Sequence, residues 1–132
     1  MILLDTHALI WVLDDAPRLG RRAAQIANRA LPTDRLWTSA ISFWEISLLV
    51  TRGRLRLTTS PEQFRSRVQG FGVLEAPLGG DVALEAATLA SLLKDPADCF
   101  VAATARLHHA TLMTADDRLI GSGVVDTVDA RR

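Results

Sequence analysis

Apolar and polar residues follow one another along the chain in blocks that predict strands alternating with helices. Residues 2–4 form a continuous apolar run, which is typical of a strand buried on both faces. Phe64, Val68 and Phe71 recur at helical spacing and predict one face of an amphipathic helix. The predicted strands are residues 2–5, 36–38, 73–76 and 111–114, with a fifth candidate at 124–128. The predicted helices are residues 6–13, 21–30, 43–50, a segment starting at 61, 81–93 and 96–108.

This alternation predicts the fold class. Strands interleaved with helices favour an α/β protein whose sheet is covered on both faces. We therefore expect a three-layer α/β/α fold with a central, mainly parallel sheet of four to five short strands. A chain of 132 residues fits one domain, and no repeat, linker or low-complexity tract divides it. Residues 1–132 are expected to form that single domain.

Four carboxylates stand where predicted strands end or predicted helices begin. Asp5 closes the first apolar run, Asp116 follows the run at 111–115, and Glu45 and Asp98 lie near helix starts. Because the carboxyl ends of parallel strands meet at one edge of a sheet, beside helix N-termini, these acids are expected to converge there. Clustered carboxylates need a compensating charge, which is usually a divalent cation. The pattern predicts a metal-dependent enzyme that acts on a phosphate ester.

Each acid also has a simpler interpretation as a helix cap, because caps are common and catalytic groups are few. Ser42 and Glu45 have the spacing of a capping box. Asp95 could cap a helix with Pro96 at its first position and Asp98 at its third. Capping does not, however, call for an Asp directly after an entirely apolar first strand. The four acids taken together favour the metal site.

Composition narrows the class of protein. Hydrophobic residues make up 48% of the chain and charged residues 23%, values that are typical of a soluble globular protein. No apolar run approaches the ~20 residues of a membrane helix, and the N-terminus lacks the basic region of a signal peptide. The single cysteine, Cys99, excludes an internal disulfide and is expected to be a small buried hydrophobe. We expect a cytoplasmic protein with no membrane association.

The net charge and the absence of several motifs argue against other kinds of site. The formal net charge is zero, which argues against a strongly basic nucleic-acid binder. The cluster of Arg52, Arg54 and Arg56 has two interpretations, a solvated loop face or a phosphate clamp, and the arginines within residues 18–22 have the same two. The chain has no glycine-rich phosphate loop and no nucleophile elbow. Its three histidines lack zinc-ligand spacing with the cysteine.

Four segments stand out in order along the chain: Leu3-Leu4-Asp5-Thr6-His7, residues 39–46, Asp95-Pro96-Ala97-Asp98 with residues 102–105, and residues 112–116. They resemble the successive motifs of PIN-domain ribonucleases, and more narrowly of the VapC toxins of toxin-antitoxin pairs. The resemblance runs from Ile2 to about Leu119, nearly the whole chain. It departs from the family at Cys99, where related sequences commonly carry Arg.

The resemblance implies a PIN-like fold and a site of four metal-binding acids, Asp5, Glu45, Asp98 and Asp116. It also implies hydroxyl donors close to these acids, Thr6 and Thr114. Among the acids, Asp5 and Asp98 are the first choice as direct ligands, and the other two would bind directly or through water.

The activity implied is that of a Mg2+- or Mn2+-dependent endoribonuclease that hydrolyses RNA to a 5′-phosphate and a 3′-hydroxyl. The partners implied are an RNA substrate, a cognate VapB-like antitoxin and a second copy of the chain in a homodimer. Trp11, Trp44, Leu48 and Leu49 could contact the antitoxin or could be ordinary core residues.

Two rival functions remain at this point. In the first, the protein is a non-catalytic RNA-binding or regulatory PIN-like module that keeps the acids without turnover. In the second, it is a structural α/β interaction module in which all four acids only cap helices.

Overall fold

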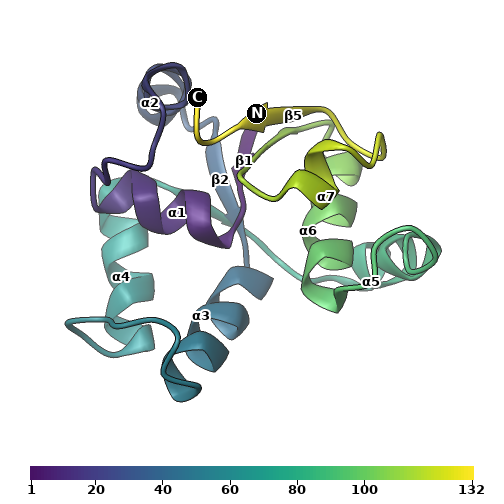
Figure 1. Cartoon of the computed structure of the whole chain (residues 1–132), viewed down its shortest axis with the longest axis horizontal. Coiled ribbons are helices and arrows are strands. Elements are labelled where there is room, and N and C mark those ends of the chain that lie inside the picture. Colours follow the sequence, from purple (N-terminus) through teal and green to yellow (C-terminus); the bar gives the residue numbers. More distant parts are fainter.

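The computed structural model describes residues 1–132 and contains one five-stranded sheet (Figure 1). All four strand pairs are parallel, in the order β3-β2-β1-β4-β5. The expected α/β/α fold with four to five strands is therefore confirmed, and the sheet is wholly parallel. The strands are β1 (Ile2–Leu4), β2 (Leu36–Ser39), β3 (Leu74–Ala76), β4 (Thr111–Thr114) and β5 (Thr127–Asp129).

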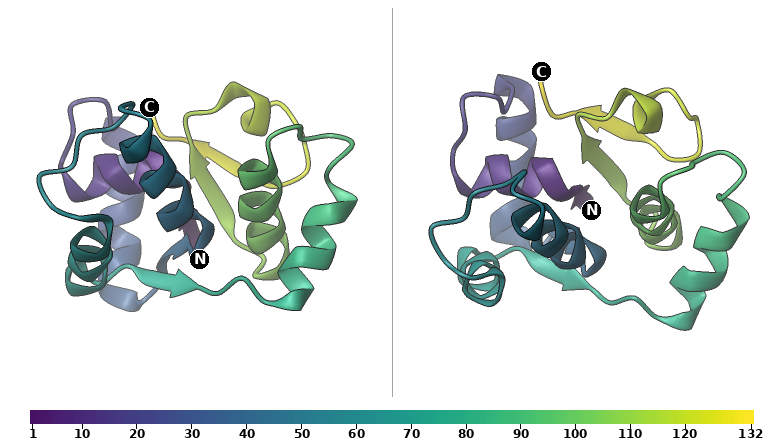
Figure 2. Two further views of the ribbon diagram at one scale, coloured as in Figure 1. Left: turned by 90° about the horizontal axis from the view of Figure 1, so that it is seen from below. Right: turned by 60° about the horizontal axis from the view of Figure 1, so that its bottom comes forward.

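Helices cover both faces of this sheet. In Figure 1, α1, α2 and α4 lie to one side and α5, α6 and α7 to the other. The views of Figure 2 show β3 at the outer edge of the sheet, with α5 and α6 together on the side away from α4. The helices are α1 (Thr6–Leu13), α2 (Arg21–Ala30), α3 (Ile41–Thr51), α4 (Pro61–Phe71), α5 (Gly80–Thr88), α6 (Pro96–Leu107) and α7 (Asp117–Ile120), and a short 3-10 helix, η1 (Leu31–Thr33), follows α2.

The continuous apolar runs of β1 and β4 supply both hydrophobic cores. Leu3 and Leu112 belong to the core beneath α5 and α6, whereas their neighbours Leu4 and Met113 belong to the core beneath α1, α2 and α4. All four side chains are fully buried. Successive side chains of a strand point to opposite faces, so adjacent apolar residues in the middle of a covered sheet enter opposite cores.

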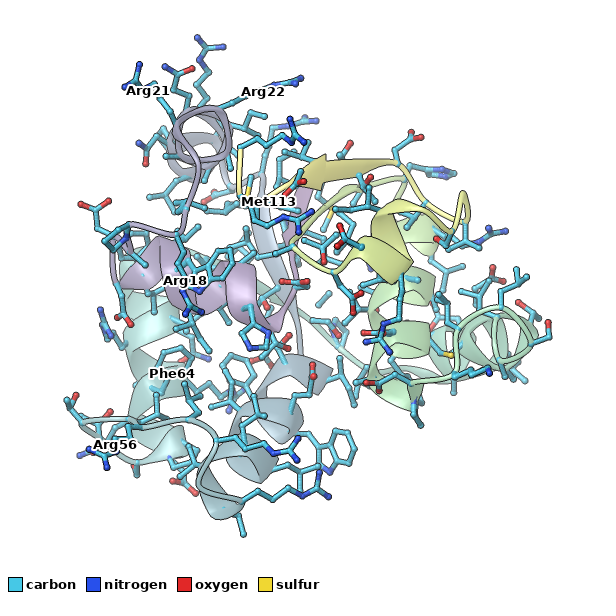
Figure 3. All side chains as sticks on the ribbon, viewed as in Figure 1. Arg18, Arg21, Arg22, Arg56, Phe64 and Met113 are labelled. Carbon is cyan, nitrogen blue, oxygen red and sulfur yellow. The ribbon has the colours of Figure 1, made fainter.

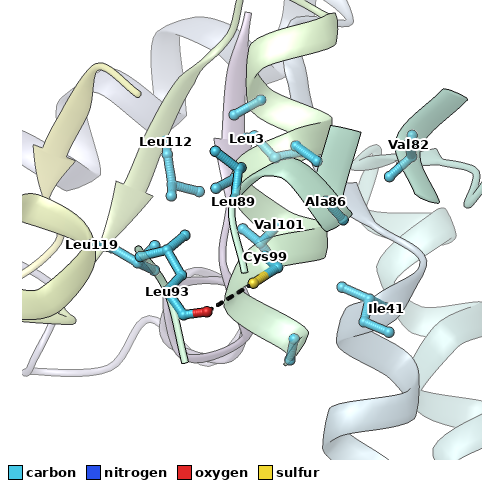
Figure 4. Close-up of a cluster of buried hydrophobic side chains, with 14 of the residues drawn as sticks. Leu3, Ile41, Val82, Ala86, Leu89, Leu93, Cys99, Val101, Leu112 and Leu119 are labelled. Atoms are coloured by element: carbon cyan, nitrogen blue, oxygen red, sulfur yellow. Dashed lines mark hydrogen bonds between the residues drawn. The ribbon is translucent and has the colours of Figure 1, made fainter. Parts of the chain in front are cut away.

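Cys99 lies in the first of these cores, as expected for a small buried hydrophobe. Its side chain is 6% exposed, and its Sγ donates to the carbonyl oxygen of Leu93 at 3.0 Å (Figure 4). The Cys99 thiol therefore packs within the core.

The strand order reverses at β1. The chain runs from β1 through β2 to β3 on one side of the sheet, and later places β4 and β5 on the other side. In open parallel sheets, such a reversal leaves a crevice at the carboxyl ends of the two strands that part there, which is where ligands bind. The ends of β1 and β4, followed by Asp5 and Asp116, flank this crevice.

Three sequence predictions differ from the structure. The helix predicted over 81–93 ends at Thr88, because Leu89 and Leu92 form turns whose backbone hydrogen bonds span three residues. The fifth strand occupies Thr127–Asp129 rather than 124–128. The capping box at Ser42 is also wrong: α3 begins at Ile41, two residues before the predicted start at residue 43, with Ala40 as its N-cap and no side-chain cap.

The predicted helix that starts at residue 61 is confirmed as α4, and a capping box begins it. Ser60 accepts from the backbone nitrogen of Gln63, and the Gln63 side chain accepts from that of Ser60. None of the helices combines the length and the apolar composition needed to span a bilayer.

Candidate active site

A cavity of about 520 Å³ lies at the crevice where the strand order reverses. All four acids predicted from the sequence line it. Asp5 follows β1, Asp116 follows β4, Glu45 comes from α3 and Asp98 from the first turn of α6. The fold thus brings together four carboxylates from separate parts of the chain.

Asp5 has a structural role and a place in the cavity at once. Its Oδ1 accepts from the backbone nitrogen of Ala8 at 2.9 Å and caps α1. Its Oδ2 accepts a hydrogen bond from the hydroxyl of Thr114, at the end of β4. Burial raises the pKa of Asp5 above its usual value, against the opposing effect of these two hydrogen bonds. One carboxylate oxygen of Asp5 therefore caps α1, while the other faces the end of β4.

Glu45 does not cap its helix, because it lies a full turn beyond the start of α3. Its Oε1 instead accepts from the hydroxyl of Thr6 at 2.5 Å, and that hydroxyl also lies 3.1 Å from the Oγ of Ser42. Burial raises the pKa of Glu45, and the negative charges of Asp95 and Asp5 raise it further. The carboxylate is held toward the cavity by a side-chain hydrogen bond alone.

Asp98 follows the cap of α6, as the sequence predicted. Asp95 is the N-cap and accepts from the backbone nitrogen of Ala97 at 2.9 Å, with Pro96 at the first helical position. Asp98 is 16% exposed, and its carboxylate accepts no hydrogen bond. Burial, with Asp95 and Asp116 nearby, raises its pKa to about 7.

Asp116 differs from the other three acids because a guanidinium donates hydrogen bonds to its carboxylate. It caps α7 by accepting from the backbone nitrogen of Arg118 at 2.9 Å. The Arg118 guanidinium donates to both Asp116 oxygens, at 3.2 and 2.8 Å, which holds the pKa of Asp116 below its usual value. The same guanidinium lies 3.7 Å from Asp98, so it joins two acids across the cavity.

Thr114 couples the ends of the two central strands. Its fully buried hydroxyl donates to Asp5 and accepts from the backbone nitrogen of Asp116 at 3.0 Å. The hydroxyls of Thr6 and Thr114, implied by the family resemblance, therefore do donate to site carboxylates. One hydroxyl fixes the spacing of two acids that are far apart in sequence.

The donor set of the cavity suits a hard divalent cation. Its lining presents carboxylate and hydroxyl oxygens, which are the ligands that Mg2+ and Mn2+ prefer. With the side chains as they lie, no group of three or more His, Cys, Asp or Glu side chains is placed to hold one ion. The chemistry and the excess negative charge of the lining fit such an ion.

Comparison with known sequences agrees with this geometry. The sequence profile of the PIN domain matches residues 2–121, which includes all four acids. The chain belongs to the PIN-domain family. Ribonuclease VapC22 of Mycobacterium tuberculosis is 32% identical over 122 residues, a match that covers 89% of this chain and 88% of that protein. The resemblance to PIN domains, and to VapC proteins among them, is confirmed.

Solved structures share the fold of this PIN domain. The structure of FitAB bound to the IR36 DNA fragment matches with a TM-score of 0.71 and 25% identity, covering 100% of this chain and 96% of that chain. A toxin-antitoxin complex from Klebsiella pneumoniae matches with a TM-score of 0.65 and 22% identity, covering 98% of each chain.

Sequence reasoning missed several residues that line the cavity of this PIN domain. Arg118 is the most important of them, because it is the only Arg or Lys in the lining. The available signal was the pattern Asp-x-Arg, which occurs at Asp116 and again at Asp129 and in both places closes a bidentate pair. The remaining lining residues beyond the predicted acids include His7, Trp11, Asp95 and Asp117.

The predicted arginine clusters lie away from this lining. Arg21 and Arg22 project from α2 at the top of Figure 3, and Arg56 lies in the loop at its lower left. None of Arg52, Arg54 and Arg56 forms an ion pair or lines the cavity. The structure agrees with a solvated loop face for this cluster, and nothing in it assigns a phosphate to these side chains.

Proposed function

We propose that this PIN-domain protein is a metal-dependent endoribonuclease, the toxin component of a type II toxin-antitoxin pair. The observation that carries the proposal is the cavity itself, where four carboxylates meet at the carboxyl edge of a parallel sheet. Its similarity to Ribonuclease VapC22 supports RNA as the substrate. An RNA substrate in turn favours action in the cytoplasm.

The proposed cofactor is Mg2+ or Mn2+. Asp5 and Asp98 are the proposed direct ligands, and Glu45 and Asp116 would bind directly or through water. The raised pKa values of Asp5, Glu45 and Asp98 support this assignment, because they reflect buried negative charge that the protein leaves largely uncompensated. A hard cation is the natural compensation for such a group of oxygens.

The residues of the site have distinct tasks in the proposed hydrolysis. The ion, when bound, supplies Lewis-acid polarisation of the scissile phosphodiester and lowers the pKa of the attacking water. Thr114 holds Asp5 in place, and Thr6 holds Glu45, so the carboxylates are oriented before the substrate arrives. In-line attack would leave a 5′-phosphate and a 3′-hydroxyl.

The proposed partners are a VapB-like antitoxin and a second copy of the chain. A structural neighbour of this chain is itself a toxin-antitoxin complex, which supports an antitoxin as the partner. Trp44 is 51% exposed on α3, and Leu48 and Leu49 are partly exposed on the same helix. Together with the half-buried Trp11 they are the proposed contact surface for the antitoxin.

The deciding experiment measures cleavage of single-stranded RNA by the purified chain in Mn2+, with EDTA and with Asp5→Asn as parallel controls. We expect cleavage by the wild type in Mn2+ only, loss of cleavage in Asp5→Asn, and 5′-phosphate ends on the products. RNA binding without turnover would instead favour the regulatory PIN-like module. Equal cleavage by wild type and Asp5→Asn would assign the activity to a contaminant.

A further inference from the structure

Arg118 occupies the position between two proposed metal ligands. Its guanidinium donates to Asp116, with Nη2 at 2.8 Å from Oδ2, and the same Nη2 lies 3.7 Å from Oδ2 of Asp98. Asp98 comes from α6 and Asp116 from the end of β4, so the guanidinium bridges two separate elements. The residues that line the cavity include six acidic side chains, and Arg118 is the only Arg or Lys among them.

A second arginine, Arg131, shows that the contact between Arg118 and Asp116 arises from residues adjacent in sequence. Arg131 pairs with Asp129 through the same Asp-x-Arg geometry, with Nε and Nη2 each 2.9 Å from a carboxylate oxygen. The short-range pair is thus a property of the three-residue motif. Both guanidiniums also reach a second acid: Arg118 faces the largely buried Asp98 across the cavity, whereas Arg131 pairs with the exposed Asp117 at 2.6 Å and does not itself line the cavity.

This placement sets Arg118 against an ion at the same carboxylates. Arg118 joins Asp98 to Asp116, and no group of three or more His, Cys, Asp or Glu side chains is placed to hold one ion. A divalent cation beside either carboxylate would lie within a few ångströms of the guanidinium, and two like charges at that separation repel each other. The guanidinium and the ion would therefore compete for the same carboxylate oxygens.

We propose that Arg118 is a positioning residue that serves as the internal counter-cation of the metal-free site and competes with the divalent ion for Asp98 and Asp116. This inference rests on the proposed function, since it concerns the same metal site. Arg118 neutralises part of the acid cluster before metal binds, and it yields when the ion arrives. Its side chain is 69% exposed at the cavity, so the displaced guanidinium can move into solvent without unfolding any element.

The test titrates Mn2+ alone into the metal-free full chain by calorimetry. The variants are Arg118→Gln, which removes the charge, Arg118→Lys, which keeps it but loses the two-point fork, and Arg131→Gln as the matched control. We expect Arg118→Gln to bind Mn2+ about tenfold more tightly than wild type, the scale of a typical coupling between two ligands. Arg118→Lys should lie between the two, and Arg131→Gln should match wild type.

A second readout separates competition from general damage. In EDTA, Arg118→Gln should melt at a lower temperature than wild type, because acid repulsion is then uncompensated, yet its Mn2+-induced rise in melting temperature should be larger. Structural damage alone would lower the melting temperature without tightening metal binding. In the wild type, the Nε–H signal of Arg118 in nitrogen-15 NMR should shift on addition of Mg2+, while that of Arg131 stays unchanged.

The results distinguish failure of this inference from failure of the proposed function. A wild-type chain that binds no Mn2+ would overturn both. Mn2+ binding by wild type with equal or weaker affinity in Arg118→Gln would overturn only the competition. An Arg118→Lys variant that binds Mn2+ no more tightly than wild type would also overturn the competition. The positive charge at this position would then account for the whole effect on Mn2+ affinity, without the two-point contact of the guanidinium.

Discussion

Asp98 is distinguished from the other three acids by the absence of any hydrogen bond to its carboxylate. Asp5 and Asp116 each accept from a backbone nitrogen, and Glu45 accepts from the hydroxyl of Thr6. Asp98 has only the ion pair with Arg118, at 3.7 Å, to offset its burial. A carboxylate with no donor of its own is available to a cation, so substitutions at Asp98 test the site most directly.

We expect Asp98→Asn to abolish both Mn2+-dependent RNA cleavage and the Mn2+-induced rise in melting temperature. The metal-free variant should keep or gain stability, because Asn relieves the repulsion from Asp95 and Asp116. The control is Asp95→Asn, which retains a capping side chain and should change stability by less than about 1 kcal/mol with the metal response intact. An active Asp98→Asn enzyme with a normal metal response would refute the assignment.

The pKa of Asp98 also predicts how stability depends on pH. The pKa of about 7 means that the folded protein keeps the Asp98 proton up to about pH 7, whereas the unfolded chain loses it near the usual aspartate pKa of 3.8. Unfolding therefore releases a proton within this window, and the contribution of Asp98 to stability is present at low pH and is lost as the pH rises through it. In EDTA, the melting temperature of wild type relative to Asp98→Asn should fall from pH 3.8 toward about 7.

Metal should reverse this trend, because the ion binds the ionised carboxylate. Mn2+ affinity should rise with pH through the same window and level off above the pKa of about 7. If the difference in melting temperature between wild type and Asp98→Asn does not vary with pH in EDTA, the pKa of Asp98 in the folded protein lies at its ordinary value.

The helices show that capping and a place in the site are compatible roles. Asp5 and Asp116 are the N-caps of α1 and α7, and both line the cavity. A carboxylate has two oxygens, and in Asp5 one satisfies the helix while the other accepts from Thr114. Asp95 takes the capping role at α6, which leaves Asp98 free. The interaction module built only from caps therefore does not account for Glu45 or Asp98.

The start of α2 is joined to the end of the chain through Gly20. The backbone nitrogen of Gly20 donates to Ala130 at 2.8 Å, and that of Arg22 donates to Arg132 at 2.9 Å. A Cβ on Gly20 would lie 2.0 Å from the carbonyl carbon of Arg132, which is closer than any allowed contact. Glycine is required here by this close approach, since the Gly20 backbone itself is in the extended region.

We expect Gly20→Ala to lower the free energy of unfolding by about 1–3 kcal/mol, the usual cost of an added group in a filled space. Gly70→Ala is the matched control, because Gly70 lies in α4 with nothing within 4 Å of its Cβ position. That variant should be more stable by roughly 0.5 kcal/mol, since alanine suits a helix better than glycine. Urea unfolding measures the change in the free energy of unfolding, which should be negative for Gly20→Ala and positive for Gly70→Ala. A Gly20→Ala variant as stable as wild type would contradict the close packing.

At the scale of the whole molecule, the site depends on the strand order. The chain reaches β2 and β3 on one side of β1 and places β4 on the other, so Asp5 and Asp116 follow adjacent strands although 110 residues separate them along the chain. Helices α3 and α6, which carry Glu45 and Asp98, contact each other across the same edge. An ion bound by all four acids would therefore link both halves of the sheet.

We expect Mn2+ or Mg2+ to raise the melting temperature of the whole domain. A ligand that binds only the folded state stabilises it by mass action, by about 2.7 kcal/mol at a hundredfold excess over its dissociation constant. Thermal unfolding followed by circular dichroism in EDTA and in saturating Mn2+ measures this, with Asp5→Asn as the control that should lose the shift. A wild-type melting curve that does not respond to either metal would count against the site.

The order of apolar and polar residues was sufficient for much of the secondary structure. The predicted helix over 21–30 and the strand over 111–114 have the same bounds in the structure. The sequence patterns that predict these two elements are local, since they depend on the spacing of apolar residues and on adjacent glycine or loop residues. The segment 89–93 is equally apolar but leaves the helix, with Leu89 and Leu93 buried and Leu92 exposed. Tertiary packing decided that break, and local periodicity could not.

The α/β alternation, the doubly buried strands and the four acids at strand and helix ends follow from the sequence alone, because each of these is encoded in neighbouring residues. Packing establishes three further features: Thr114 joins Asp5 to Asp116, Glu45 is free of capping, and Arg118 faces Asp98. These contacts depend on distances between residues remote in sequence. The pKa of about 7 at Asp98 likewise arises from burial and from neighbouring charges that exist only once the strands and helices have packed.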